Sequence, residues 1–235
     1  MRTNHLMGYF LVLSVFAVQA DETFKPLLIG GASVSKTNSY SYLGLITPVL
    51  GGDLNTGWYA VATTSYLRYE YDKDIANIST RVKVKAPGAD VGIGYAWSGK
   101  NYSLRLATSL GARNFTTQPN NLPGENSGVK IYLTPQIEAN YQFNQWLSSS
   151  LISNYSIGPD NYFNRFRLGA NLGGGWNIGP EAFYLGGKNY KTQQYGLYVS
   201  KSMGSGLSLE LSAGKVIPEN GDNSTYGSVA FSKLF

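Results

Sequence analysis

Residues 129–143 read VKIYLTPQIEANYQF, and this stretch decides the fold. Alternate positions are apolar or aromatic: Val129, Ile131, Leu133, Pro135, Ile137, Ala139, Tyr141 and Phe143. The positions between them are mostly polar: Lys130, Tyr132, Thr134, Gln136, Glu138, Asn140 and Gln142. A period of two is the signature of a β-strand, and this run is longer than a common strand of a soluble domain. The stretch therefore predicts a long strand that separates an apolar from a polar environment.

The same alternation recurs along the chain after residue 20. We predict about twelve strands, at 27–35, 39–48, 57–71, 77–97, 101–117, 128–143, 146–157, 161–175, 178–187, 190–202, 206–217 and 224–235. An even number is typical of single-chain bacterial membrane barrels. No linker and no segment with helical periodicity interrupts the pattern, so residues 21–235 are predicted to form one domain.

The predicted connections differ in length on the two sides of the sheet. Those at 51–56, 98–100, 144–145, 177 and 203–205 form one set and are mostly short, whereas 118–127 and 218–223 fall in the other set and are longer. Short turns on the side of both termini and longer loops opposite are typical of outer-membrane barrels. Aromatic residues near the strand ends would form the two interfacial girdles. They are Trp58, Tyr59, Tyr69, Tyr71, Tyr95, Trp97, Tyr102, Tyr141, Trp146, Tyr155, Trp176 and Tyr226.

A soluble β-sandwich or a lipocalin-like barrel would also show alternation. In such a protein the apolar face forms the core, and a closed barrel of this size would have a wide apolar interior. Apolar side chains toward lipid and polar side chains toward a lumen suit the sequence better. We therefore predict an all-β fold, a transmembrane up-and-down antiparallel β-barrel of about twelve strands in the bacterial outer membrane, with outer-membrane lipid as a partner.

The first twenty residues are predicted to be a secretory signal peptide. A weakly positive start with Arg2 precedes an apolar stretch from Leu6 to Val18, and Ala20 supplies a small residue for cleavage. An uncleaved anchor is the alternative, but the stretch is short for a membrane span. Cleavage would leave residues 21–235, with 18 basic and 14 acidic side chains.

Composition excludes several kinds of chemistry. The chain has 235 residues, no Cys and a single His, His5, which lies in the predicted signal peptide. Disulfide scaffolds, thiolate metal sites and His-based triads are therefore excluded from the mature chain. We predict no enzyme activity, no catalytic residue, no metal site, no cofactor and no nucleic-acid partner. Gly173-Gly174-Gly175 falls in the predicted strand 161–175 and is interpreted as a bend or a close backbone approach, not a phosphate loop.

The polar face of the predicted barrel carries charges of both signs. The candidates for lining the lumen are Arg68, Glu70, Arg105, Arg113, Glu138, Arg165, Arg167, Glu181 and Glu210. Arg81, Lys83, Lys85 and Lys130 are assigned to the same face. Arginine facing lipid at mid-membrane costs about 2–4 kcal/mol, so we expect the five arginines to point inward and to pair with the four glutamates. Such a lumen is either held rigid by these pairs without transport, or is a polar conduit for saccharides.

Pro180-Glu181 is the sharpest single position among these candidates. Proline has no backbone donor for the ladder, so Pro180 is expected to mark a bend or bulge that aims Glu181. Glu181 is predicted either to anchor an arginine or to contact a polymer in the lumen.

Several short motifs, in order along the chain, resemble the BcsS family of outer-membrane proteins associated with bacterial cellulose biosynthesis. They are YSYLG at 40–44, GDL at 52–54, GWY at 57–59, YEY at 69–71, GIGYAW at 92–97, IGPE at 178–181, LG at 185–186, LSLELSAG at 207–214 and YG at 226–227. The resemblance implies a role in making or exporting a cellulose-type exopolysaccharide, with the polysaccharide and cellulose-secretion proteins as partners. It implies no catalytic residue.

Three other functions stay open at this point. One is a channel for the uptake of acidic oligosaccharides, which the inward Arg and Lys residues suggest. Another is a structural or adhesion barrel without transport, whose longer loops face outward. The last is a lipid-modifying enzyme.

Overall fold

The structure is a computed structural model that describes residues 25–75, 78–120, 127–187, 190–219 and 222–235. The predicted signal peptide lies outside the described residues. Twelve strands form in the described part of the chain: β1 (Leu27–Ser35), β2 (Asn38–Pro48), β3 (Gly57–Ile75), β4 (Ile78–Ser98), β5 (Tyr102–Gln118), β6 (Gly128–Gln142), β7 (Leu147–Ser156), β8 (Asn161–Gly173), β9 (Trp176–Gly187), β10 (Tyr190–Ser202), β11 (Leu207–Pro218) and β12 (Ser224–Leu234).

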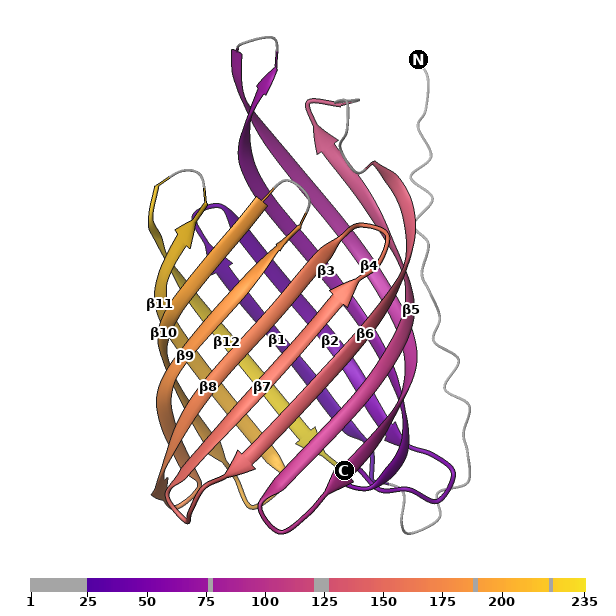
Figure 1. Cartoon of the computed structure of the whole chain (residues 1–235), viewed down its shortest axis with the longest axis vertical. Coiled ribbons are helices and arrows are strands. Elements are labelled where there is room, and N and C mark those ends of the chain that lie inside the picture. Colours follow the sequence, from indigo (N-terminus) through magenta and orange to yellow (C-terminus); the bar gives the residue numbers. More distant parts are fainter. Residues whose placement is uncertain (1–24, 76–77, 121–126, 188–189, 220–221) are drawn as a thin grey trace, which may run out of the picture.

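The strands close into one antiparallel barrel (Figure 1). Each strand pairs with its neighbours in sequence, and β1 closes the ring by pairing with β12 from Leu27↔Leu234 to Ser35↔Tyr226. Closure gives every strand a partner on both sides, which a chain in lipid requires because lipid offers no hydrogen bonds. The predicted fold class is confirmed. No helix in the described residues has the length and apolar character of a membrane span.

The two ends of the barrel differ in height. The β3–β4 hairpin and the ends of β5 and β6 rise above the other strands at the upper end in Figure 1, and the chain terminates at the lower end. The predicted contrast in loop length is only partly present, because the β2–β3 connection at the lower end spans 49–56 and the upper connections at 36–37, 76–77 and 188–189 are short.

Most strand bounds lie within one residue of the prediction, but three differ by more. β3 continues to Ile75, four residues past its predicted end, and β9 begins two residues early, at Trp176. β8 ends at Gly173, and Gly174 and Gly175 form the turn to β9. All three glycines have positive φ, between 57° and 82°, which a residue with a Cβ rarely adopts.

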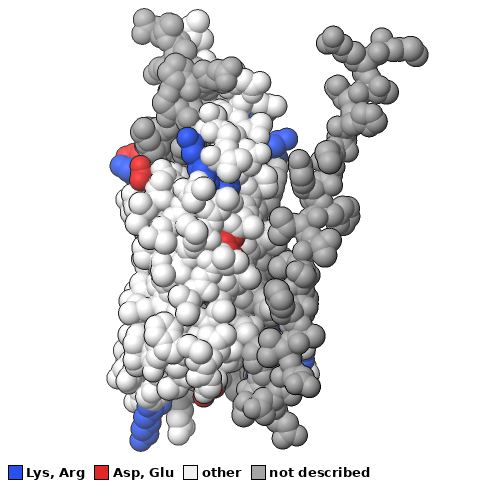
Figure 2. All heavy atoms as spheres, turned by 90° about the vertical axis from the view of Figure 1, so that its right-hand side faces the viewer, with Lys and Arg blue, Asp and Glu red and all other residues white. Residues whose placement is uncertain are grey.

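The outer face of the barrel is apolar between its two ends. Its exposed residues include Leu43, Leu45, Val91, Ile93, Leu106, Leu110, Ile131, Leu133, Leu197, Leu211 and Val229. Figure 2 shows that Lys, Arg, Asp and Glu gather toward the two ends of the visible face, with an almost uncharged band between them. This distribution fits a barrel whose middle contacts lipid.

Aromatic residues near the strand ends occupy both faces of the barrel. Trp58, Trp97, Tyr102, Tyr141, Trp146 and Trp176 are exposed close to the lower turns, and Tyr155 is exposed at the upper end of β7, as predicted. Tyr59, Tyr69 and Tyr226 are instead buried inside the barrel. Assigning all aromatics at strand ends to the girdles was wrong, because a large barrel also needs bulky side chains to fill its interior.

Several of the buried tyrosines lie across glycines of neighbouring strands. Tyr132 pairs with Gly111, and a Cβ on Gly111 would meet its ring at 2.6 Å. Tyr226 crosses Gly214 and reaches Gly196, where a Cβ would stand 2.3 Å from its hydroxyl oxygen. The glycines therefore let each ring pack flat against the wall, because a side chain there would hold the ring away.

Apolar side chains cluster on part of the inner wall near both ends of the barrel. The lower cluster consists of Ile46, Tyr59 and Ala96, with Leu27, Ile29, Leu54, Val61 and Ala107 packed against them. The upper cluster consists of Tyr69, Val82, Val84, Ala86 and Phe115, with Leu67, Tyr71 and Tyr190 packed against them. Apart from Tyr190 of β10, both clusters belong to β1–β5 and the β2–β3 connection.

Replacing Gly179 with alanine is expected to destabilise the barrel. A Cβ at this position in β9 would stand 1.8 Å from the carbonyl oxygen of Leu168 in β8, so the two strands would have to separate. Overpacking of this kind costs about 1–3 kcal/mol. The free energy of unfolding in detergent, followed by tryptophan fluorescence in urea, measures the loss. The matched control is Gly227→Ala in β12, where a Cβ meets nothing within 4 Å. Equal stability of the two variants would contradict this steric account.

Candidate functional site

The largest group of buried charges in the lumen joins three strands at mid-height. Arg165 and Arg167 come from β8, Glu181 from β9 and Glu210 from β11. Arg167 and Glu181 are direct partners in the β8–β9 ladder, so their side chains leave the sheet on the same face. Strand alternation places Arg165 one step further along that face. We call these four residues the central charge cluster.

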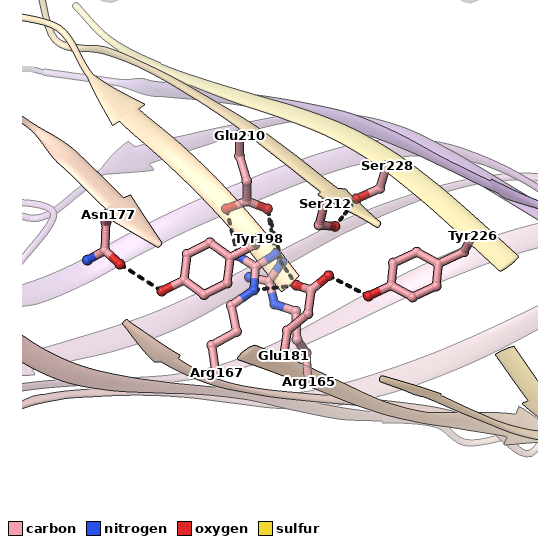
Figure 3. Close-up of polar contacts among 9 residues, drawn as sticks. All are labelled: Arg165, Arg167, Asn177, Glu181, Tyr198, Glu210, Ser212, Tyr226 and Ser228. Carbon is pink, nitrogen blue, oxygen red and sulfur yellow. Dashed lines mark hydrogen bonds and ion pairs between the residues drawn. The ribbon is translucent and has the colours of Figure 1, made fainter. Parts of the chain in front are cut away.

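Arg167 holds the cluster together (Figure 3). Its Nε donates to Glu181 Oε2 at 2.7 Å, and its Nη1 and Nη2 donate to the two carboxylate oxygens of Glu210 at 2.6 Å each. Nη2 also lies 2.6 Å from Glu181 Oε2. A fork that meets a carboxylate with two parallel bonds is the strongest geometry for an arginine pair. One guanidinium thus links two carboxylates from different strands.

Two tyrosines complete the surroundings of this guanidinium. The Tyr226 hydroxyl donates to Glu181 Oε1 at 2.7 Å, so both oxygens of that carboxylate accept a hydrogen bond. The guanidinium of Arg167 lies over the ring of Tyr198, 4.4 Å from its centroid, and the Tyr198 hydroxyl donates to Asn177 Oδ1 at 3.0 Å. The cation is therefore bounded by carboxylates at its edge and an aromatic ring at its face.

The cluster is electrically balanced but deeply buried. The Glu181 side chain is 0% exposed and that of Arg167 is 6% exposed. Removing such charges from water is costly, and only close pairing with satisfied hydrogen bonds compensates. Arg165 is the exception, because it lies 3.8 Å from Glu210 and its buried Nε has no partner among the described residues.

A second ion pair lies nearer the lower end of the lumen. Arg105 of β5 faces Glu138 of β6 as its direct ladder partner, and their charged atoms are 3.6 Å apart. Arg105 also donates to the backbone oxygen of Leu54, from Nη2 at 2.8 Å and from Nε at 3.2 Å. Leu54 belongs to the β2–β3 connection and packs against the lower apolar cluster. Arg105 therefore fixes this connection to the barrel wall.

Arg113 points inward but does not pair with a glutamate among the described residues. Its Nη2 donates to Ser65 Oγ at 3.1 Å, its guanidinium lies 5.4 Å from the centroid of the Tyr132 ring, and its buried Nε has no partner there. The nearby carboxylate is Asp90, which accepts from the Tyr132 hydroxyl at 3.4 Å. The predicted glutamate partner is therefore wrong for Arg113. Sequence reasoning missed Asp90. Its position on the same alternating face of β4 as Gly88 and Gly92 was a signal that its carboxylate points into the lumen.

Arg68 and Glu70 form an ion pair, but not in the lumen. They are bonded at 2.6 Å on the β3–β4 hairpin, on the face opposite the buried Tyr69. Glu70 lies past the last ladder pair between β3 and β2, at Asn38↔Tyr69. The hydrogen bond from Arg68 lowers the pKa of the Glu70 carboxyl below its ordinary value. Their assignment to the lumenal face is corrected: above the lipid the exterior is water, so charges turn outward there and apolar residues turn inward.

The same correction applies to three other cations of this hairpin. Arg81, Lys83 and Lys85 are exposed and alternate with the buried Val82 and Val84. Arg81 binds Asp72 through Nε at 2.6 Å, across the hairpin. By contrast, Lys130 is the direct ladder partner of the inward-facing Arg113, so it lies on the inward face to which it was assigned.

Pro180 does not produce the predicted bulge. The β8–β9 register is the same on both sides of it, from Arg167↔Glu181 to Ala170↔Ile178, and the irregularity falls at Asn171/Gly173. Strand alternation alone aims Glu181 into the barrel. The missing donor interrupts the ladder opposite Pro180 and Gly179, but the pairing resumes in the same register at Ala170↔Ile178, so no extra residue is inserted.

A contact between two tyrosines crosses the upper lumen. The rings of Tyr69 in β3 and Tyr190 in β10 stack with centroids 4.6 Å apart and planes 29° apart. Five ladder steps separate β3 from β10 around the ring, so the contact spans the interior and is not made along the wall. Both residues belong to the upper apolar cluster. Sequence reasoning missed this constriction because Tyr69 was assigned to a girdle.

These arrangements favour binding and structural roles for the lumen. Among the described residues, no group of three or more His, Cys, Asp and Glu side chains could hold a metal ion. The charged groups form hydrogen-bonded pairs, which stabilise a fixed lumen shape. Tyrosine, serine and asparagine side chains around them offer donors and acceptors for a polar ligand.

Comparison with known proteins gives one family and a consistent set of folds. The sequence model of the family described as cellulose biosynthesis protein BcsS matches residues 27–235. No curated protein sequence matches the chain. An outer membrane channel from Pseudomonas putida F1 is similar in structure, with a TM-score of 0.59 and 12% identity over 90% of this chain and 95% of that one. The KdgM porin gives a TM-score of 0.56 and 12% identity, over 89% and 99% of the two chains.

A second KdgM porin structure, in complex with disordered oligogalacturonate, gives a TM-score of 0.55 at 12% identity, over 89% of this chain and 99% of that one. At such identity these likenesses concern the fold alone. They agree with a barrel of the outer-membrane type.

Proposed function

Because this chain belongs to the cellulose biosynthesis protein BcsS family, we propose that it supports the synthesis or export of a cellulose-type exopolysaccharide at the bacterial outer membrane. The family match over nearly the whole barrel carries this proposal. The signal peptide at 1–20 would direct the chain to the secretory pathway, and residues 21–235 would form the membrane domain. Its partners would be outer-membrane lipid, the polysaccharide and cellulose-secretion proteins.

The lumen supports an accessory role over a wide diffusion pore. Its arginines Arg105 and Arg167 are paired with carboxylates, and apolar clusters lie above and below them. An uptake channel for acidic oligosaccharides would need a clear excess of lumenal cations, whereas the described lumenal arginines are largely matched by carboxylates, so this alternative receives less support. We propose a non-enzymatic function, because the central charge cluster holds its groups in mutual pairs and not toward a substrate.

Deleting the gene from its own bacterium is expected to lower extracellular cellulose, which Congo red binding and cellulase-released glucose measure. Complementation with the wild-type gene should restore it. Sensitivity to large antibiotics serves as the control for general damage to the outer membrane. Normal cellulose output in the deletion strain, with loss of surface attachment or of growth on an oligosaccharide, would instead support the adhesion barrel or the uptake channel.

A further inference from the structure

Two stacked tyrosines form an accessible aromatic surface inside the barrel. Tyr40 and Tyr42 of β2 lie with ring centroids 5.8 Å apart and planes 23° apart. They alternate with the outward-facing Leu43 and share a face with the buried Gly44 and Ile46, so both point inward. Tyr40 nevertheless remains 38% exposed, and this exposure is toward the lumen. We call the two rings the tyrosine platform.

The platform differs from the other aromatic rings of the interior. Tyr59, Tyr132, Tyr198 and Tyr226 are almost completely buried, so their faces are covered. A ring face open to the lumen is what a sugar needs, because its C–H groups can pack on the ring while its hydroxyls stay free. In the barrel wall, Tyr40 offers such a face.

Two arginines with unused donors face the lumen near the platform. Arg113 donates to Ser65 Oγ at 3.1 Å, and Ser65 is the direct ladder partner of Tyr42. Arg165 and Glu210 lie within electrostatic range of Tyr42. Each arginine has a buried Nε without a partner in the described residues. The contacts of Arg165 there comprise the 3.8 Å ion pair and no hydrogen bond. An unmet donor is costly, so an incoming oxygen acceptor would be favoured at both places.

The described charges that face the lumen nearly balance one another. The cations are Arg105, Arg113, Lys130, Arg165 and Arg167, and the carboxylates are Asp90, Glu138, Glu181 and Glu210. A nearly balanced set exerts little net attraction on an acidic sugar. It still offers many donors and acceptors to hydroxyl groups. The surroundings of the platform therefore suit a neutral saccharide better than a charged one.

We infer that the tyrosine platform, with Arg113 and Arg165 beside it, is a lumenal subsite for a neutral β-linked glucan segment. A glucose ring stacks on Tyr40, and its hydroxyl oxygens accept hydrogen bonds from the two guanidiniums. This inference rests on the proposed function and specifies which part of the barrel contacts the polysaccharide.

The test uses the full barrel purified in detergent and cellohexaose as the ligand. Isothermal titration calorimetry is expected to show binding to the wild type and to Tyr40→Phe, which keeps the ring. Tyr40→Ala is expected to weaken binding about tenfold, the size of one aromatic contact. Tyr66→Ala is the matched control, because Tyr66 lies in the neighbouring strand on the outer face and should bind as the wild type does. Heat-dependent gel mobility verifies that each variant is folded.

Three outcomes would overturn the inference. One is equal binding by Tyr40→Ala and Tyr66→Ala, and another is binding of a hexuronic acid hexamer in place of cellohexaose. The third is no cellohexaose binding by the folded wild type. If Tyr40→Ala does not fold, Arg165→Lys replaces it in the test. This variant loses two hydrogen-bond donors and must weaken cellohexaose binding. The two experiments separate failure of the inference from failure of the proposed function. If the purified barrel does not bind cellohexaose but the deletion strain makes less cellulose, only the subsite is refuted. If the barrel binds cellohexaose but the deletion strain makes normal amounts of cellulose, only the proposed function is refuted.

Discussion

Replacing Arg167 with methionine is expected to lower the free energy of unfolding of the barrel by about 3–5 kcal/mol, the cost of leaving a buried charge without its partner. Glu181 has a fully buried side chain and would keep only the hydrogen bond from Tyr226. Glu210 would lose both of its short bonds to the guanidinium. Urea unfolding in detergent, followed by tryptophan fluorescence, measures the change.

Three further variants identify the cause of the loss. Adding Glu181→Gln to Arg167→Met removes the stranded charge, so the double variant should be more stable than Arg167→Met alone. Arg165→Met should cost far less, because the described contacts of Arg165 include no hydrogen bond. Glu181→Gln alone should destabilise the barrel. If it folds with normal stability and lowers cellulose output, Glu181 contacts polymer and its role as an arginine anchor is refuted.

Removing the tyrosine contact across the upper lumen is expected to raise ion conductance several-fold. Tyr69→Ala with Tyr190→Ala deletes both rings of the 4.6 Å stack, and the rest of the upper cluster lines one side of the opening this creates. Apolar constrictions exclude ions and water, so their loss opens a path. Single-channel recordings in planar lipid bilayers compare the double variant with the wild type.

Tyr66→Ala again serves as the control, since it removes a tyrosine from β3 on the outer face. Its conductance should equal that of the wild type. A wild-type barrel that already conducts as freely as the double variant would show that this contact does not restrict the lumen.

The strand order and the closed barrel were predictable from the sequence because lipid imposes a strict rule on alternate residues. Over 129–143 each outward position must be apolar, so the pattern fixes which way every side chain points. The observed strand β6, Gly128–Gln142, differs from the predicted range by one residue at one end. Turns were less predictable: the three glycines at 173–175 continue the alternation in the sequence, yet positive φ values end β8 there.

The pairs within the lumen were only partly predictable. Arg105–Glu138 and Arg167–Glu181 are ion pairs between direct ladder partners, and the prediction that these arginines pair with glutamates is confirmed. The partnership of Arg167 with Glu210 spans non-adjacent strands, and alternation carries no information about which residues meet across the interior.

Arg68 was placed wrongly because the rule for alternate residues reverses above the membrane. There the outer face of the barrel contacts water, so a charged residue at an alternate position no longer has to face the lumen. The long β3–β4 ladder, from Gly57↔Ala96 to Ile75↔Ile78, extends from the membrane into water. No residue pattern in the sequence shows where the membrane ends.

The tyrosines that lie across glycines restrict which residues can occur together at positions far apart in the sequence. Tyr226 needs Gly214 and Gly196 on two successive strands, since a Cβ at either would collide with its ring or hydroxyl. A tyrosine at 226 is therefore compatible only with glycine at both 196 and 214. The reverse does not hold, because a Cβ at 214 would also stand 2.2 Å from the backbone oxygen of Tyr195, and one at 196 would stand 2.3 Å from that of Ala213. Homologues that have tyrosine at 226 should therefore have glycine at both other positions.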